Sequence, residues 1–325
     1  MAHPNFVAGL DFLPPLAKNL FLVLNSIILI APSPHFFQKG TTMKYSMNLL
    51  LWTDTLSQDK LPLLDKMKSI GFDAVELPMF DRDVANAAAW GKAMDNLGLS
   101  RTGTCAFGPD DHLISDDPKI RRNATDSIKK ILDCCAAAGC SVMAGHATQA
   151  LGIFSGKGPT QDEWNWALDG IREAAEHAGK VGVKIALEAL NRFECYFVNC
   201  MADVGRFARE INHPSCGVMY DTFHANIEEK TARGAITSVK DILFHVHISE
   251  ADRSTPGTGM VHWDETFDTL HEIGYDGILC CEAFGLALPK LSAATKIWRQ
   301  MYESEEQLAK DALAFMKKHV EKRWK

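Results

Sequence analysis

The sequence predicts an α/β protein, a single (β/α)8 TIM barrel with a long C-terminal helical extension. From residue 44 onward, eight short apolar runs alternate with longer amphipathic stretches, which is typical of a parallel sheet with helical crossovers. Five glycines follow a helical stretch and precede an apolar run, as left-handed helix caps do: Gly71, Gly98, Gly139, Gly182 and Gly274. An open doubly wound sheet normally has a glycine-rich first turn, but Trp52 is followed by Thr-Asp-Thr-Leu-Ser. The closed barrel is therefore favoured.

The elements are expected in regular alternation, without an internal linker. Strands are expected over 44–52, 74–80, 101–107, 141–146, 184–190, 216–224, 242–250 and 277–284. Helices are expected over 58–70, 84–97, 118–138, 160–181, 201–211 and 264–273, with a final helical region over 289–319. Ser57 and Asp59 supply an N-cap and an acidic first turn for the first helix. Pro118 suits the first turn of its helix, where the missing N–H costs nothing.

The chain divides into a leader and one catalytic domain. With 325 residues, 46% of them apolar, it is long enough for one large barrel over 43–325. The first 42 residues differ in character, and their apolar stretch over 20–30 is shorter than the roughly 20 residues that span a bilayer. We expect this leader to be disordered or outside the native fold. Lys18 before the stretch and Ala31 after it leave a secretory signal as the alternative.

Charge and cysteine usage limit the partners and the compartment. The net charge is −7, with no basic stripe, which argues against nucleic acid and anionic membrane and favours a small-molecule substrate. Nine cysteines form no CxxC pair, and Cys216 and Cys280 lie inside apolar strand patterns. This usage indicates a reducing, cytoplasmic protein.

One polar residue stands at the end of each of the last four predicted strands. These residues are Glu188, Asp221, His247 and Glu282, separated by 33, 26 and 35 positions, each about one βα unit. Strand ends of a parallel barrel converge at its mouth, so the four side chains can reach one point. Three carboxylates and one imidazole favour Mn²⁺, Mg²⁺ or Co²⁺. The alternatives are helix N-caps or ion pairs for the acids, and a core role for His247 or its neighbour His245.

Three further polar residues follow these strand ends. Glu194 lies six residues after Glu188, His224 three after Asp221, and Arg253 six after His247. Loop residues of this kind would line a pocket over the metal and bind hydroxyl groups. Solvated loop side chains are the alternative interpretation.

These motifs, EALNRFE, DTFHANIEE, HVHISEADR and CEAF, match in order and spacing those of the ketose 3-epimerase family. The resemblance extends from residue 43 to the C-terminal helix, and that family belongs to the xylose-isomerase-like barrel group. It implies that Glu188, Asp221, His247 and Glu282 are metal ligands and that Glu188 and Glu282 move the proton. It also implies that Glu194, His224 and Arg253 hold the O1–O3 end of a ketose, with Phe284 as an apolar wall. The family varies at 106–113, so no substrate-selecting residue is assigned there.

The activity implied by this resemblance is inversion of C3 in a free ketohexose of the D-tagatose or D-fructose/D-allulose type. The proton would leave and return through a metal-bound cis-enediolate, with Mn²⁺ as the expected ion and Co²⁺ or Mg²⁺ as alternatives. The alternative functions are an aldose–ketose isomerase and a 3-epimerase of a phosphorylated ketose. For the latter, the loop over 255–260 would cradle the phosphate. Family analogy and the aromatic region 289–325 predict a homodimer or homotetramer.

Overall fold

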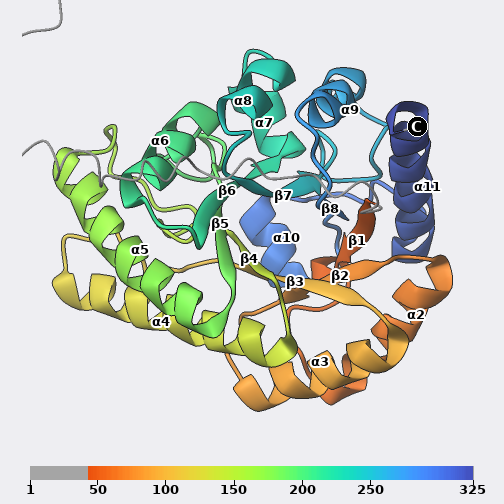
Figure 1. Ribbon diagram of the computed structural model, residues 1–325, viewed down its shortest axis with the longest axis horizontal. Helices are drawn as coiled ribbons and strands as arrows, with labels where there is room; N and C mark the ends of the chain where they lie inside the picture. The colour runs from red at the N-terminus through yellow and green to blue at the C-terminus, as the bar shows by residue number, and fades with distance from the viewer. Residues whose placement is uncertain (1–42, 325) are drawn as a thin grey trace, which may run out of the picture. The chain divides into compact units, whose positions relative to one another are not determined.

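The computed structural model describes residues 43–324, which form a closed barrel of eight parallel strands in the order β1 to β8 (Figure 1). β1 pairs with both β2 and β8, which closes the sheet and confirms the predicted fold class. The strands are β1 (Lys44–Asn48), β2 (Ala74–Pro78), β3 (Ser100–Cys105), β4 (Val142–Gly145), β5 (Lys184–Leu187), β6 (Cys216–Asp221), β7 (Leu243–Ile248) and β8 (Ile278–Cys281). The predicted leader, residues 1–42, lies outside the described residues.

Helices surround the strands (Figure 1). They are η1 (Leu49–Leu51), η2 (Gln58–Lys60), α2 (Pro62–Ile70), α3 (Val84–Leu97), α4 (Pro118–Ala138), α5 (Gln161–Val181), α6 (Met201–Ile211), α7 (Thr222–Glu228), α8 (Ala232–Ser238), α9 (Trp263–Glu272), α10 (Pro289–Thr295) and α11 (Glu305–Arg323). All five predicted cap glycines have positive φ, from 62° to 107°. Among residues 43–324, none of the helices combines the length and apolar character needed to cross a membrane.

Several boundaries differ from the sequence prediction: each of the eight strands ends earlier than expected, and residues 49–51 of the first predicted strand form η1. The first predicted helix is divided into η2 and α2, and the Ser57 side chain makes no capping hydrogen bond within the described part of the chain. The predicted strand 216–224 ends at Asp221, and two short helices that were not predicted, α7 and α8, follow it. The C-terminal region is two helices, because α10 ends at Lys296, whose φ is 62°, and α11 begins only after Ser304.

The interior of the barrel has an apolar part and a polar part. Val142, Ala144, Ala186 and Met219 pack together on neighbouring strands β4, β5 and β6, with Phe244 against them. Across the barrel, the interior positions on β1, β2, β3 and β7 are polar and fully buried: Ser46, Asn48, Glu76, Thr102 and His245. Barrel interiors are usually filled with branched apolar side chains, so this polar part requires an explanation.

A β-bulge between β6 and β7 determines which residues meet at the mouth. Val218 pairs with Leu243 but Met219 pairs with His245, so Phe244 is an extra residue on β7. Gly217 leaves space for Phe244, since a Cβ there would lie 2.6 Å from the Phe244 ring. Beyond the bulge, Asp221 pairs with His247, whereas an uninterrupted register would have paired it with Val246.

Candidate active site and metal centre

The four predicted metal ligands come together at the mouth of the barrel. Ligand atoms of Asp221, His247 and Glu282 lie within 4.8 Å of one another, and so do those of Glu188, Asp221 and His224. His247 Nδ1 is 3.3 Å from Asp221 Oδ2 and 3.4 Å from Glu282 Oε1. All four predicted ligands are buried, with at most 8% of the residue exposed. The two groups share Asp221, which therefore stands at the centre of the cluster.

The donor set fits a divalent cation. Asp221 Oδ2 and His247 Nδ1 are fully buried, face each other, and have no hydrogen-bond partner among residues 43–324. Buried polar atoms without a partner are costly, and a cation between these two atoms would satisfy both. Three carboxylate oxygens with one imidazole nitrogen suit Mn²⁺, Mg²⁺ or Co²⁺.

The electrostatics of the cluster also call for positive charge. Burial, and then the negative charges of Asp221 and Glu282, raises the pKa of Glu188 well above its usual range. Burial raises the pKa of Glu282 to about 7, and the positive charges of His247 and Arg253 limit the rise. A bound cation would stabilise the ionised form of both carboxylates.

The three predicted substrate contacts surround this cluster. His224, on α7, has Nε2 at 3.5 Å from Glu188 Oε1, and its Nδ1 accepts a hydrogen bond from the Asn191 backbone N–H. Arg253 donates to Glu282 Oε2 at 3.0 Å and lies 3.7 Å from Glu194 Oε1. Glu194, His224 and Arg253 therefore form one polar wall beside the predicted ligands.

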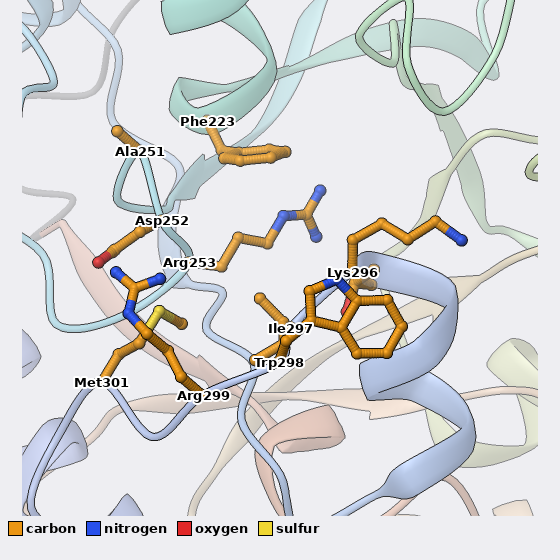
Figure 2. A pocket seen from close by; sticks show the side chains of 10 residues that line it. Phe223, Ala251, Asp252, Arg253, Lys296, Ile297, Trp298, Arg299 and Met301 are labelled. Carbon is orange, nitrogen blue, oxygen red and sulfur yellow. The ribbon is translucent and has the colours of Figure 1, made fainter.

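Arg253 is held tightly although it lies in a loop. Its guanidinium lies 4.1 Å from the ring centre of Phe223 and 4.7 Å from that of Phe284. Its φ of 60° is left-handed, a conformation that costs a non-glycine residue about 1–2 kcal/mol. Figure 2 shows Arg253 below Phe223, at the edge of a cavity of about 320 Å³ that Trp298 also lines. Phe284, the predicted apolar wall, is thus packed on Arg253.

Glu250, fully buried at the end of β7, organises the loop that carries Arg253. Its carboxylate accepts hydrogen bonds from the backbone N–H groups of Ala251, Gly257 and Val261, and from the indole of Trp263. The N–H group of Gly257 lies within the predicted phosphate-cradling segment 255–260, and that of Val261 directly follows it. Because they bind Glu250, they are not available to a phosphate in this conformation.

Sequence reasoning missed the polar network beneath the cluster. Glu76 Oε1 accepts from His247 Nε2 at 2.7 Å and from Asn48 Nδ2 at 3.0 Å, and Asn48 also donates to Glu282 Oε1. Glu76 Oε2 accepts from Thr102 and lies 2.9 Å from His245 Nε2. The available signal was an acid inside the apolar run AVELP. His245, for which the sequence left a core role as an alternative, belongs to this network.

His146, just beyond β4, was also missed. Gly145 pairs with Leu187, and continuing this register would align His146 with Glu188. His146 is 8% exposed, and its Nε2 has no hydrogen-bond partner among the described residues. Burial, together with the positive charge of Arg253, lowers its pKa to about 4. A neutral imidazole therefore stands next to one of the two predicted proton-moving carboxylates.

Comparison with known proteins is consistent with this geometry. Residues 64–319 match the family described as "Xylose isomerase-like TIM barrel". The chain is 31% identical to a D-psicose 3-epimerase of Ruminiclostridium cellulolyticum, over 84% of this chain and 95% of the relative. It is 28% identical to a ketose 3-epimerase of Arthrobacter globiformis, over 85% and 96%. A crystal structure of a D-allulose 3-epimerase from Methylomonas sp. in complex with D-allulose superimposes with a TM-score of 0.81 at 27% identity, over 86% and 98%. The chain therefore belongs to the xylose isomerase-like TIM barrel family and, within it, to the ketose 3-epimerases.

Proposed function

We propose that the protein inverts C3 of a free ketohexose, with a divalent cation held by Glu188, Asp221, His247 and Glu282. The observation that carries this proposal is the pair of buried, unpartnered atoms Asp221 Oδ2 and His247 Nδ1, with Glu188 and Glu282 next to them. Membership of the ketose 3-epimerases supplies the substrate class. When bound, the cation, for which we propose Mn²⁺, acts as a Lewis acid toward the carbonyl and adjacent hydroxyl oxygens.

The chemistry requires two groups on opposite faces of C3. In one direction, Glu188 as carboxylate takes the C3 proton, and the electron pair of the broken C–H bond moves into the enediolate of the sugar. Glu282 as carboxylic acid then gives its proton to the other face of C3. In the reverse direction the two residues exchange roles. Burial raises the pKa of both groups, which favours a proton on one of them and so supports an acid–base pair.

Positioning decides which carbon exchanges its proton. Arg253, His224 and Glu194 lie on one side of the cluster, where they would bind the O1–O3 end of the ketose. Phe223 and Phe284 hold the guanidinium of Arg253 in place, so this wall is rigid before substrate arrives. A fixed O1–O3 end leaves C3 between Glu188 and Glu282.

A free rather than phosphorylated ketose is favoured by Glu250. Its carboxylate occupies the N–H groups of Gly257 and Val261, and it would repel a phosphate at this loop. We further propose a cytoplasmic homodimer or homotetramer, supported by nine free cysteines and by the 71% exposed Trp298. Light scattering that gives a monomeric mass would contradict the oligomer.

NMR in D₂O tests the function. Mn²⁺ is loaded, the protein is incubated with D-tagatose, D-fructose or D-allulose, and the separated sugars are analysed, with metal-free protein as the control. We expect deuterium at C3 together with the C3 epimer. Deuterium at C1 with an aldose product would indicate an isomerase instead. The absence of exchange in all three sugars would contradict a free-ketohexose epimerase.

A further inference from the structure

We infer that Glu76 is a positioning residue that orients His247, so that Nδ1 of His247 faces the metal position. Glu76 lies on β2 and His247 on β7, 171 residues apart in the chain, and both are at most 1% exposed. This inference rests on the proposed function insofar as it assumes a cation at the cluster. Glu76 itself is assigned no contact with the substrate.

The first step is the choice of ring nitrogen. His247 Nε2 lies 2.7 Å from Glu76 Oε1, and an ionised carboxylate can only accept, so Nε2 carries the proton. The other ring nitrogen, Nδ1, is then free to bind through its lone pair. That nitrogen points to Asp221 Oδ2 and Glu282 Oε1, at 3.3 and 3.4 Å. A carboxylate behind a metal-binding histidine fixes the orientation of the ring and makes the ligand nitrogen more basic.

The second step is that Glu76 is itself held in place. Thr102 donates to Oε2 at 2.8 Å, and Asn48 Nδ2 donates to Oε1 at 3.0 Å. The Asn48 amide cannot flip freely, because its Oδ1 accepts from the backbone N–H of Leu50. Glu76 is therefore fixed from β1 and β3 while it contacts β7. This accounts for the polar part of the barrel interior.

An alternative group of ligand atoms lies on the Nε2 side of His247. Glu76, His245, His247 and Cys280 also lie within 4.8 Å of one another and are fully buried. However, both oxygens of Glu76 are already engaged, Oε1 by His247 Nε2 and Oε2 by Thr102, with His245 Nε2 at 2.9 Å from Oε2. On the other side of the His247 ring, Asp221 Oδ2 and His247 Nδ1 have no hydrogen-bond partner in the described part of the chain. The geometry thus assigns the cation to the Nδ1 side of His247 and the supporting role to Glu76.

The test is the affinity of metal-free, full-length protein for Mn²⁺, measured by electron paramagnetic resonance of the free ion. Glu76→Ala is expected to weaken Mn²⁺ binding by about 10–100-fold. Glu76→Gln keeps a carbonyl acceptor for His247 and is expected to recover most of the affinity. The matched control is Thr269→Val on α9, a fully buried threonine whose hydroxyl donates to the Glu265 backbone carbonyl and not to the Glu76 network, and it should stay within about threefold of wild type. Equal affinity of folded Glu76→Ala and wild-type protein would overturn the inference.

A second measurement on the wild-type protein covers the case in which Glu76→Ala does not fold. Histidine ¹⁵N NMR of Mg²⁺-loaded protein should show His247 protonated at Nε2. Protonation at Nδ1 would overturn the inference. Neither readout depends on turnover, so a protein that binds Mn²⁺ as expected but epimerises no ketose would contradict the proposed function and leave the role of Glu76 intact.

Discussion

The two proposed proton-moving carboxylates occupy equivalent strand ends but have different surroundings. Glu188 follows β5 above the apolar cluster that contains Ala186 and Met219. No group among residues 43–324 donates a hydrogen bond to its carboxylate, and His224 Nε2 lies 3.5 Å away. Glu282 follows β8 beside the polar network, and it accepts hydrogen bonds from Asn48 and Arg253. Both carboxylates are therefore buried, but of the two only Glu282 accepts hydrogen bonds from donors within residues 43–324.

This difference shows that residue type and strand position alone do not determine the hydrogen bonding and pKa of a carboxyl group. Burial raises the pKa of both groups, and the positive charges of His247 and Arg253 oppose the rise in both, so that the pKa of Glu282 reaches about 7. The difference between the two carboxylates lies in the barrel interior, where the apolar cluster is on the Glu188 side and the polar network is on the Glu282 side. Substitutions can therefore test each side separately.

The largest expected effect comes from removing either carboxylate. Glu188→Gln and Glu282→Gln should each lower kcat for epimerisation by about 10³-fold or more, since each removes an acid–base group that has no substitute on its face. Steady-state kinetics with Mn²⁺ present measure this. Glu303→Gln, at an exposed position near the C-terminus, is the control and should match wild type. Retained turnover in either variant would contradict the two-base mechanism.

Metal removal comes next in size. Chelation should abolish epimerisation, and Mn²⁺ should restore it. At a free concentration 100 times its Kd, the ion should stabilise the fold by about 2.7 kcal/mol, because it binds only the folded cluster. Differential scanning calorimetry with and without Mn²⁺ gives the shift in Tm. In Asp221→Asn, which weakens the central ligand, adding Mn²⁺ at the same concentration should leave Tm nearly unchanged. A wild-type Tm insensitive to Mn²⁺ would contradict the site.

A substitution of Asn48 distinguishes the Glu282 side of the barrel interior from the Glu188 side, because Asn48 donates a hydrogen bond to Glu282. Asn48→Ala removes a donor to Glu282 and to Glu76 but does not touch Glu188, and it should lower kcat by about 10- to 100-fold, the value of a hydrogen bond to a charged group. Met219→Leu, a volume-conserving change in the apolar cluster, should stay within about threefold. Equal kcat values for the two variants would contradict the proposed difference between the Glu188 side and the Glu282 side of the barrel interior.

The last prediction concerns the stability of the fold rather than catalysis, and it rests on His146. Its pKa in the folded protein is about 4, below the 6.5 of an unfolded histidine, so below pH 6.5 the unfolded chain takes up the proton first. Stability is therefore lost as the pH falls from 6.5 toward 4. Between pH 7.5 and pH 5, His146→Gln should lose about 2 kcal/mol less than wild type in urea unfolding of metal-free protein. Parallel losses in both proteins would show that His146 is not buried in its neutral form.

The fold and the proposed ligands could be predicted from the sequence because both follow local rules. Helix, glycine and strand alternate regularly, and a polar residue at a strand end is visible without knowing what lies across the barrel. Glu76 and Asn48 were missed because their importance depends on contacts between strands far apart in the chain. The bulge at Phe244 was invisible as well, although it alone aligns His247 with Asp221. The break at Lys296 carries no proline or glycine that would predict it.

Deuterium exchange without turnover tests the central claim most directly, namely that Glu188 and Glu282 act on opposite faces of C3. Mn²⁺-loaded Glu188→Gln and Glu282→Gln are incubated in D₂O with each member of the ketose pair that the wild-type protein interconverts, and C3 is followed by NMR. We predict that each variant exchanges C3 of only one epimer, with retention, and that the two variants select opposite epimers. Exchange of the same epimer by both variants, or epimer formation by either, would contradict this account.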